Sequence, residues 1–419
     1  MISLRNKKYK YFLYFAIYFS EGLISLIFFV IMPIYLKDDV LGLGMSDFSI
    51  SIVLGLIIIP LILKGFIGPF IDQFPIRKLG GKRKPYIIIG IIINIILLPF
   101  LILINVKASI LTLIFFMGVV VLQSFGIVLM DLSMDALVVD TFDDRAEKYK
   151  ANLTFQIATY LSFLPGIVVG SFCQSGNFLA GFITGSLFCL IGLIAPLFLK
   201  EDSEYSKVPT FNLKEFSSFF KTKSILMILI FIFFIQFDTG LLDFTLDPFL
   251  RTFMSMDINY QMIAFSPGII FGLLGAFFAT KIKNKFGFVN PVIVHSLISS
   301  AYYIIVAFSL FQGAALFNSI YIFGGYITSF TSSIAFIYYF SMLMNSCNKK
   351  QAGSVMAFFY TIINLGRLTG IIIAGLIPES ILGTYYKMFW IFILCGIAMS
   401  IRLIALKKVD PSLIEFKIK

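Results

Sequence analysis

The sequence predicts an all-α polytopic membrane protein with twelve transmembrane helices in two six-helix halves. Of its 419 residues, 59% are hydrophobic and only 13% charged, whereas about a quarter of a soluble domain is charged. Apolar runs of about 20 residues, the length that crosses the hydrocarbon layer, recur along the chain. Most of the 33 Lys and Arg fall on alternate loops and at the two ends, which predicts that both termini are cytoplasmic.

The first apolar run, from about Tyr11 to Leu36, is too long for a signal peptide and lacks a small-residue cleavage site, so we expect a retained helix. The expected spans lie near 11–36, 47–69, 86–106, 109–136, 151–173, 177–199, 224–249, 259–280, 288–310, 313–343, 352–377 and 385–406.

The long hydrophilic stretch from Lys200 to Lys223 divides these spans six and six. It predicts an N-terminal half at 1–199, a cytoplasmic linker at 200–223 and a C-terminal half at 224–419. Apolar residues at helical spacing from Phe211 to Phe220 predict an amphipathic helix on the cytoplasmic surface.

A weak internal repeat supports two related halves. The pattern from Gly68 through Asp72 to Pro85 recurs from Gly275 to Pro291, again with a basic turn but without the carboxylate. Two halves related by a parallel repeat are the architecture of a rocking transporter.

Several function classes are excluded by composition. The net charge of +11 is spread over separate loops, which does not provide the contiguous basic face that nucleic acid needs. The four cysteines have no metal-ligand or disulfide spacing. A single histidine argues against a metal site and a metalloenzyme, and no Gly-rich phosphate loop occurs, so we expect no metal, cofactor or ATP site.

A polar hinge joins the second and third spans. Gly68-Pro69 is followed by the carboxylate of Asp72, and five cations then precede the next span, namely Arg77, Lys78, Lys82, Arg83 and Lys84. Cations at the headgroup level interact with anionic lipid. This arrangement resembles the loop between the second and third helices of major facilitator transporters, which implies that fold.

Ionisable residues within spans cost at least about 2.5 kcal/mol each at the helix centre, so each calls for a role. The candidates for solute or proton binding are Glu21, Asp131, Asp135, Asp238, Asp243 and Arg367. In the facilitator architecture the first, fourth and seventh helices are central, so their carboxylates are expected to converge on one cavity and to act as proton carriers.

Other polar residues are expected at the membrane surface. Asp72 and Asp140 lie at cytoplasmic helix ends near cations, and we interpret the gate as Asp72, Arg77, Arg83, Asp140 and Arg145. Asp247 and Arg251 form either a surface pair or part of the outer mouth. His295 is expected to be structural.

Two stretches resemble the folate–biopterin transporter family. The first contains Lys37-Asp38-Asp39, Gly42-Leu43, Pro60, Lys64, Gly68, Asp72, Phe74-Pro75-Ile76 and Lys82-Arg83-Lys84-Pro85-Tyr86, and the second runs from Asp131 to Asp140. The resemblance implies proton-driven transport of a folate, pterin or comparable solute. A carboxylate such as Glu21 or Asp131 would accept hydrogen bonds from the pterin edge, and Arg367 or Arg251 would pair with a folate carboxylate.

Alternatives remain within and outside transporters. The turn from Gly81 to Tyr86 also resembles cation-coupled sugar symporters, and the stretch from Asp131 to Asp140 also resembles muropeptide permeases and acetyl-CoA transporters. A membrane receptor or enzyme is the remote alternative. We expect a monomer in the cell membrane whose partners are lipid, a small organic solute and a coupling ion, by preference the proton.

Overall fold

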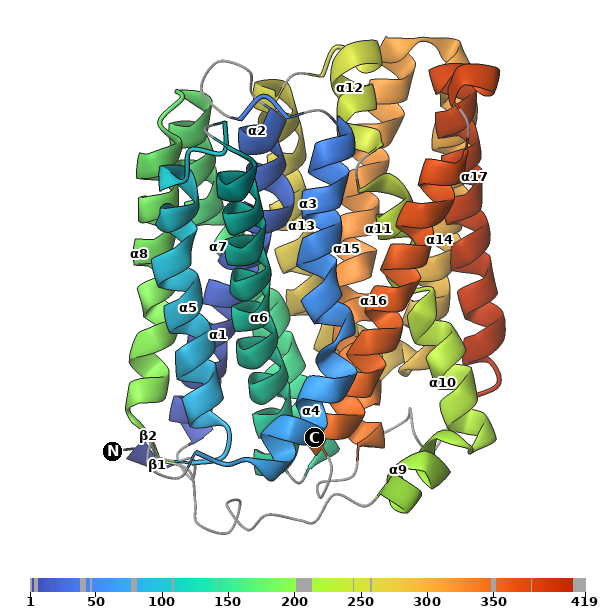
Figure 1. Cartoon of the computed structure of the whole chain (residues 1–419). Helices are drawn as coiled ribbons and strands as arrows, with labels where there is room; N and C mark the ends of the chain where they lie inside the picture. The colour runs from blue at the N-terminus through green and yellow to red at the C-terminus, as the bar shows by residue number, and fades with distance from the viewer. Residues whose placement is uncertain are drawn as a thin grey trace. The chain divides into compact units, whose positions relative to one another are not determined.

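The computed structural model describes residues 2–3, 7–37, 43–45, 47–76, 81–107, 109–142, 144–200, 213–243, 245–256, 258–347, 352–377 and 379–409. Within these ranges the elements are helices (Figure 1), apart from the two-residue strands β1 (Ile2–Ser3) and β2 (Leu199–Lys200), which pair in parallel. The prediction of an all-helical protein is confirmed.

The helices before residue 211 are α1 (Lys7–Leu26), a π-helix η1 (Ile27–Ile31), α2 (Met32–Lys37), α3 (Asp47–Ile62), α4 (Lys64–Gln73), α5 (Lys84–Leu103), α6 (Ile110–Thr141), α7 (Arg145–Gln174) and α8 (Phe178–Leu197). The later ones are α9 (Leu213–Phe220), α10 (Lys223–Phe233), α11 (Phe237–Leu242), α12 (Leu246–Met254), α13 (Ile258–Phe286), α14 (Val289–Ser309), a 3-10 turn η3 (Leu310–Gln312), α15 (Ala314–Ser346), α16 (Ala352–Leu376) and α17 (Glu379–Leu406).

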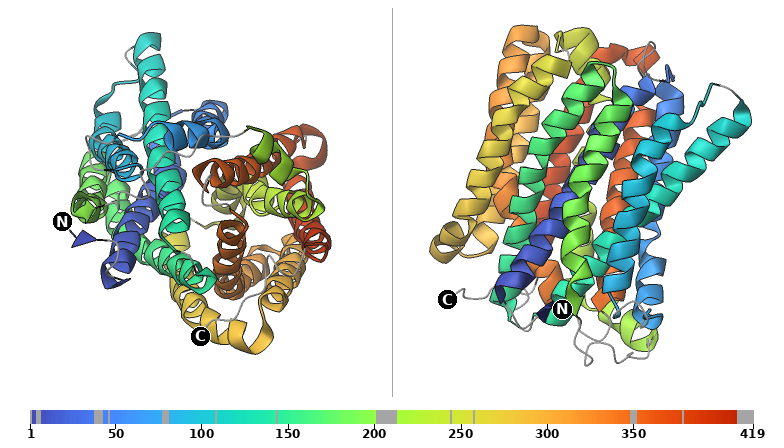
Figure 2. Two further views of the ribbon diagram at one scale, coloured as in Figure 1. Left: turned by 90° about the horizontal axis from the view of Figure 1, so that it is seen from below. Right: turned by 90° about the vertical axis from the view of Figure 1, so that its left-hand side faces the viewer.

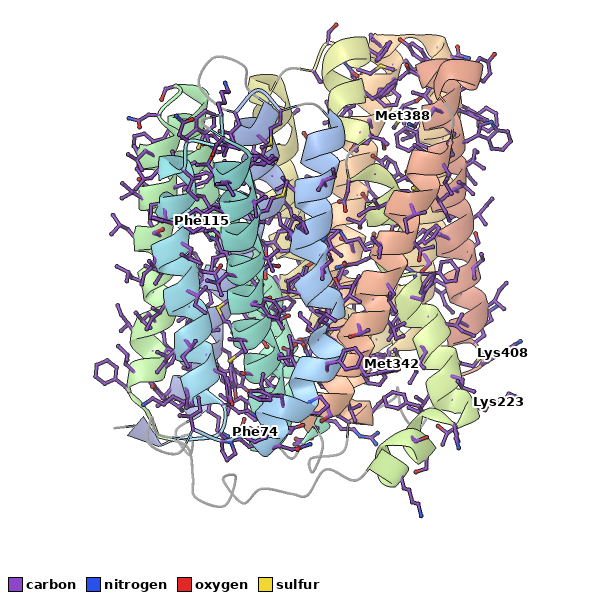
Figure 3. The ribbon with its side chains drawn as sticks, viewed as in Figure 1. Phe74, Phe115, Lys223, Met342, Met388 and Lys408 are labelled. Atoms are coloured by element: carbon purple, nitrogen blue, oxygen red, sulfur yellow. The ribbon has the colours of Figure 1, made fainter. Side chains whose placement is uncertain are left out.

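Helical segments occupy each of the predicted spans. Ten of the described helices are long and apolar enough to cross a membrane, or eleven if α3 and α4 form one span bent by 44°. Their outer surfaces carry large exposed apolar side chains such as Phe115 (Figure 3), as expected where lipid surrounds the protein. The count of twelve and the cytoplasmic termini stay predictions.

The predicted span near 224–249 is present but interrupted, since Lys223–Leu242 qualifies as one apolar span. It is divided into α10, α11 and α12, with turns at 234–236 and before Leu246. Pro248 cannot donate the backbone hydrogen bond that would continue a helix through the second turn.

The chain forms two compact units. Unit 1 contains Met1–Phe211 and Cys347–Tyr360, and unit 2 contains Asn212–Ser346 and Thr361–Lys419. The start of α16, Ala352–Tyr360, thus belongs to unit 1, and the rest of that helix to unit 2. The half boundary predicted at 200–223 stays a prediction, and α9 supplies a helix where the amphipathic one was expected.

The packing inside each unit follows a similar order. In unit 1, α1 packs on α7 and α8 (Figure 2), α5 packs on α6 and α8, and α3 packs on α6. In unit 2, α14 packs on α15 and α17, and α13 packs on α15. The pairs α5–α6 and α14–α15 correspond, as do α3–α6 and α13–α15, which agrees with the internal repeat.

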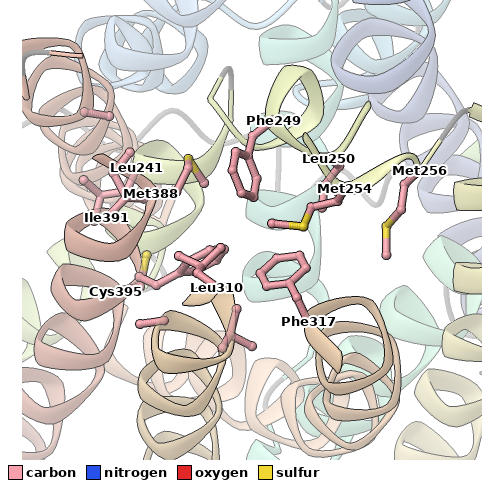
Figure 4. Close-up of a cluster of buried hydrophobic side chains, with 14 of the residues drawn as sticks. Leu241, Phe249, Leu250, Met254, Met256, Leu310, Phe317, Met388, Ile391 and Cys395 are labelled. Atoms are coloured by element: carbon pink, nitrogen blue, oxygen red, sulfur yellow. The ribbon is translucent and has the colours of Figure 1, made fainter. Parts of the chain in front are cut away.

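Unit 2 has an apolar core under α12. Phe249 and Met254 of α12 lie against Phe317 of α15 and against α17 residues such as Met388 (Figure 4). At the other end of this unit, Lys223 at the start of α10 and Lys408 after α17 both project outward (Figure 3).

Glycines let the unit 1 helices approach closely, as is common where helices pack in membranes. A Cβ atom on Gly90 of α5 would meet the carbonyl oxygen of Gly126 and lie 2.8 Å from the Met130 nitrogen of α6. A Cβ on Gly126 would lie 2.6 Å from Asn94 Nδ2. The two helices therefore touch backbone to backbone.

We expect Gly90→Leu to destabilise the protein, because a side chain there must push α5 away from α6. Overpacking of this kind costs about 1–3 kcal/mol or more, so the apparent melting temperature in detergent should fall by about 5 °C or more. Gly118→Leu on α6 is the matched control, since a Cβ there has nothing within 4 Å. Equal melting temperatures for the two variants would contradict this packing.

Candidate functional site

Unit 1 holds a set of buried and half-buried polar side chains that we call the acidic cluster, defined as Tyr18, Glu21, Lys64, Asp131, Asp135 and Tyr360. Helix α6 places Asp131 and Asp135 one turn apart, and they are only 6% and 2% exposed. Residues four apart share a helix face. Both carboxylates therefore point to the same neighbours from α1, α4 and the start of α16.

Asp131 is paired with the only lysine of the cluster. Lys64 Nζ donates to Asp131 Oδ2, and both side chains are almost fully buried. The same ammonium lies 4.3 Å from the centroid of the Tyr360 ring, a cation–π arrangement that partly replaces lost hydration.

Asp135 is held by two tyrosines. Tyr18 donates its hydroxyl to Asp135 Oδ1 at 2.6 Å, and Tyr360 donates to Oδ2. Both carboxylate oxygens are thus satisfied by neutral donors. Tyr360 contacts both the Lys64 ammonium and Asp135, so it connects the two halves of the cluster.

Glu21 completes the cluster from α1. Its carboxyl lies close to those of Asp131 and Asp135, so negative charges on the three groups would repel one another. Its Oε2 atom is buried and has no hydrogen-bond partner among the described residues. Three carboxyl groups thus face a single lysine among the described side chains.

This imbalance decides what the cluster can do. An uncompensated buried charge costs several kcal/mol, so three ionised carboxylates against one cation would be unstable. Neutrality requires protons on the carboxyls or a bound group that donates hydrogen bonds or carries positive charge. The acidic cluster is therefore suited to exchange protons or to bind such a donor.

A second polar site, which we call the latch, joins the end of α4 to α6 and to the start of α16. Arg83 Nη2 donates to Asp72 Oδ1 at 2.7 Å, and Arg83 Nε donates to Asp140 Oδ2 at 2.9 Å. Lys82 Nζ lies 3.3 Å from Asp72 Oδ1. Arg83 is 1% exposed, so both carboxylates share one buried guanidinium.

The start of α16 supplies the rest of the latch. The backbone N–H and the hydroxyl of Ser354 each donate to Asp72 Oδ2 at 2.8 Å. The first N–H groups of a helix have no partner inside it, and the helix dipole favours an anion there. Gly353 makes this approach possible, because a Cβ on it would lie 2.8 Å from Asp72 Oδ1.

The electrostatics of the latch keep Arg83 charged. Burial alone would lower its pKa, but Asp140 and Asp72 raise the pKa of Arg83 above the usual arginine value. Burial and the Arg83 guanidinium lower the pKa of Lys82, while Asp72 opposes this. Arg83 is therefore the permanent cation of the latch, and Lys82 the weaker one.

Unit 2 holds the remaining predicted carboxylates. Arg367 Nε of α16 donates to Asp243 Oδ2 at 2.6 Å. Asp238, which is 6% exposed, accepts from the Tyr303 hydroxyl at 3.1 Å, and its Oδ1 has no partner among the described residues. Two predicted site residues, Arg367 and Asp243, thus balance each other.

The structure brings together many of the residues chosen from the sequence. Glu21, Asp131 and Asp135 meet in the acidic cluster, and Asp72, Arg83 and Asp140 meet in the latch. Convergence with the seventh-span carboxylates stays a prediction.

Other expected residues lie elsewhere. Arg77 lies outside the described residues, as do the side chains of Asp247 and Arg251. Arg145 begins α7 with an exposed side chain, so its part in a gate stays a prediction. His295 is buried, with Nδ1 3.0 Å from Thr331 Oγ1.

Sequence reasoning missed the partners rather than the carboxylates. Lys64 was visible as a lone cation in an apolar run, and that isolation is the signal that could have placed it opposite Asp131. Tyr18, Tyr360 and Ser354 gave no such signal, since tyrosine and serine are common in these spans and their partners are distant in sequence.

Comparison with known proteins agrees with this architecture. The sequence profile of the Major Facilitator Superfamily matches residues 11–371. The fold is similar to a bacterial homologue of the iron transporter ferroportin in an outward-facing state, with a TM-score of 0.72, 14% identity and coverage of 95% of this chain and 99% of that one.

Two further solved structures are similar. The human organic anion transporter MFSD10 (TETRAN) has a TM-score of 0.70 and 12% identity, covering 96% of this chain and 99% of that one. The proton:xylose symporter XylE, bound to 6-bromo-6-deoxy-D-glucose, has a TM-score of 0.72 and 12% identity, covering 95% of each chain. With a superfamily match over most of its length, apolar spans and this fold, the chain is an integral membrane transporter that belongs to the Major Facilitator Superfamily.

Proposed function

We propose that the protein is a proton-coupled secondary transporter of a folate- or pterin-like solute that works by alternating access. The observation that carries the proposal is the acidic cluster, in which Glu21, Asp131 and Asp135 face Lys64 as the one lysine among the described side chains. Protons that neutralise this excess of carboxyls would be the coupling ions.

The cluster also fits the edge of a pterin. A carboxylate can accept two hydrogen bonds from the amino group and ring N–H of a pterin. Glu21 Oε2, which has no hydrogen-bond partner among the described residues, is the acceptor that would receive one of these bonds. Tyr360, which is partly exposed, would offer its ring to a flat heterocycle.

The latch would close the cytoplasmic end of the pathway in one state of the cycle. It combines one permanent cation with two buried carboxylates and the N-terminus of α16. Opening must break these contacts together, which gives two distinct states rather than a continuum. In unit 2, an anionic tail such as a folate carboxylate would have to compete with Asp243 for Arg367.

The test is uptake of radiolabelled folate and biopterin into proteoliposomes under an imposed pH gradient. We expect gradient-driven uptake that Asp131→Asn lowers at least about tenfold, because the variant loses both the proton site and the partner of Lys64. Asp144→Asn, which removes an exposed N-cap carboxylate of α7, is the control and should retain uptake.

Two results would reject parts of this proposal. No uptake of either compound by folded, reconstituted protein would reject the folate or pterin assignment, and uptake of a sugar with sodium would favour the sugar symporters instead. Pterin uptake that ignores both the gradient and Asp131→Asn would reject proton coupling through the acidic cluster.

A further inference from the structure

The acidic cluster and the latch lie at opposite ends of the same three helical segments. Helix α4 begins with Lys64 and carries Asp72 in its last turn. Helix α6 carries Asp131 toward its middle and Asp140 near its end. The start of α16 carries Ser354 in the latch and Tyr360 in the cluster. Each segment therefore contributes one residue to each site.

The spacing along the three segments is similar. At 1.5 Å of rise per helical residue, Lys64 and Asp72 are about 12 Å apart along the axis, Asp131 and Asp140 about 14 Å, and Ser354 and Tyr360 about 9 Å. A continuous helix transmits displacement along its axis because its backbone hydrogen bonds resist stretching. The two sites are thus linked by short rigid segments.

Helix α4 is packed against the start of α16 between the two sites. A Cβ on Gly68 would meet Ala357, and it would lie 2.7 Å from the carbonyl oxygen of Gly353 and 3.1 Å from the Ser354 Cα atom. Movement of α4 therefore reaches the residues of the latch both through Asp72 and through this direct contact.

Lys64 is the residue on which the position of α4 depends. It is the first residue of α4, immediately after Leu63, where the bend of 44° separates α3 from α4. A cation in the first turn of a helix is disfavoured by the helix dipole, so the ammonium needs Asp131 and the Tyr360 ring to stay buried there. Without Asp131 it would be drawn toward other charges or toward water.

We propose that Lys64 is the coupling residue of this transporter, through which neutralisation of Asp131 opens the latch. A proton or a hydrogen-bond donor that takes over Asp131 releases Lys64, α4 turns at the bend, and Asp72 leaves Ser354 and Arg83. The groups facing Lys64 and Asp131 are Glu21 and Tyr18 from α1, Asp135 from α6 and Tyr360 from α16. The inference rests on the proposed alternating access, but not on the identity of the solute.

The start of α16 gives a direct readout of the latch. The Ser354 N–H donates to Asp72 and, as an N-terminal amide, has no acceptor within its own helix. Its protection from hydrogen exchange therefore reports whether the latch is closed. The experiment is hydrogen–deuterium exchange by mass spectrometry on peptides covering 352–360 in the full-length protein in nanodiscs, with no solute added.

We expect Asp131→Asn to raise exchange at 352–360 at least about fivefold, and Lys64→Met to do the same. The double variant should exchange no faster than either single one, since both act on one pair. Lys283→Met, which removes a buried lysine of unit 2, should match the wild type, and Lys64→Arg should retain most protection.

The expected pattern requires that peptides from α6, α8 and α15 keep wild-type protection, which separates latch opening from unfolding. If Lys64→Met unfolds, the isosteric Asp131→Asn alone decides the question. The proposal is overturned if the folded single variants leave 352–360 as protected as in the wild type, or if their effects add. Because no solute is present, failure to transport pterins would not change this result.

Discussion

Replacing Arg83 with leucine is expected to open the latch and to abolish transport. The side chain is 1% exposed and binds Asp72 and Asp140 at 2.7 and 2.9 Å. Its loss leaves two buried carboxylates with Lys82 as a weaker cation. Removing one partner of a buried ion pair costs about 3–5 kcal/mol, equivalent to a factor of about a hundred to a few thousand in the equilibrium between closed and open latch.

The measurement pairs hydrogen exchange at 352–360 with solute uptake by the same reconstituted protein. Exchange should rise to the level of an unprotected helix start, and uptake should fall below detection. Lys150→Leu, which removes an exposed cation of α7, serves as the control and should change exchange little. Wild-type protection and uptake in Arg83→Leu would show that the guanidinium does not hold the latch.

Gly353→Val is the second substitution expected to have a large effect. A Cβ atom at this position would lie 2.8 Å from Asp72 Oδ1, closer than real Cβ atoms approach, and 3.0 Å from Arg83 Nη1, which is also tight. Valine would therefore separate the start of α16 from the end of α4 and break the hydrogen bonds from Ser354. We expect uptake to fall at least about tenfold while the protein remains folded, because the clash is confined to one turn.

Gly375→Val is the matched control for this substitution. It lies near the other end of the same helix, and a Cβ there has nothing within 4 Å. Both changes replace glycine by valine in the same helix and so carry a similar intrinsic change in helix propensity, and a difference between them measures the clash. Equal uptake by the two variants, each above half of the wild-type rate, would mean that the latch tolerates a side chain at Gly353.

The fold could be predicted because a membrane restricts the choices. Backbone groups in hydrocarbon must be paired within a helix, so apolar length alone predicts where helices lie. Apolar length does not predict helix breaks such as those between α10, α11 and α12, because the whole segment is apolar. The breaks depend instead on Pro248 and on the packing of α16 glycines against α10. A Cβ on Gly366 would meet the Phe233 carbonyl, a contact that no periodicity reveals.

The candidate site could be predicted in part for a similar reason. Buried carboxylates are rare and costly in a span, so Glu21, Asp131 and Asp135 were conspicuous. Their partners were not conspicuous, because they are distant in sequence. Lys64 lies 67 residues from Asp131, and Tyr360 lies 225 residues from Asp135. The role of Ser354 depends on a helix N-terminus meeting Asp72, which only the fold can show.

If the acidic cluster carries a proton together with the solute, each solute molecule that enters brings protons with it. The most direct measurement is the internal pH of proteoliposomes loaded with pyranine, with equal pH on both sides, after biopterin is added outside. We expect the lumen to acidify in parallel with the entry of radiolabelled biopterin, and this acidification to disappear in Asp131→Asn. Biopterin entry without acidification, or acidification that is unchanged in Asp131→Asn, would contradict it.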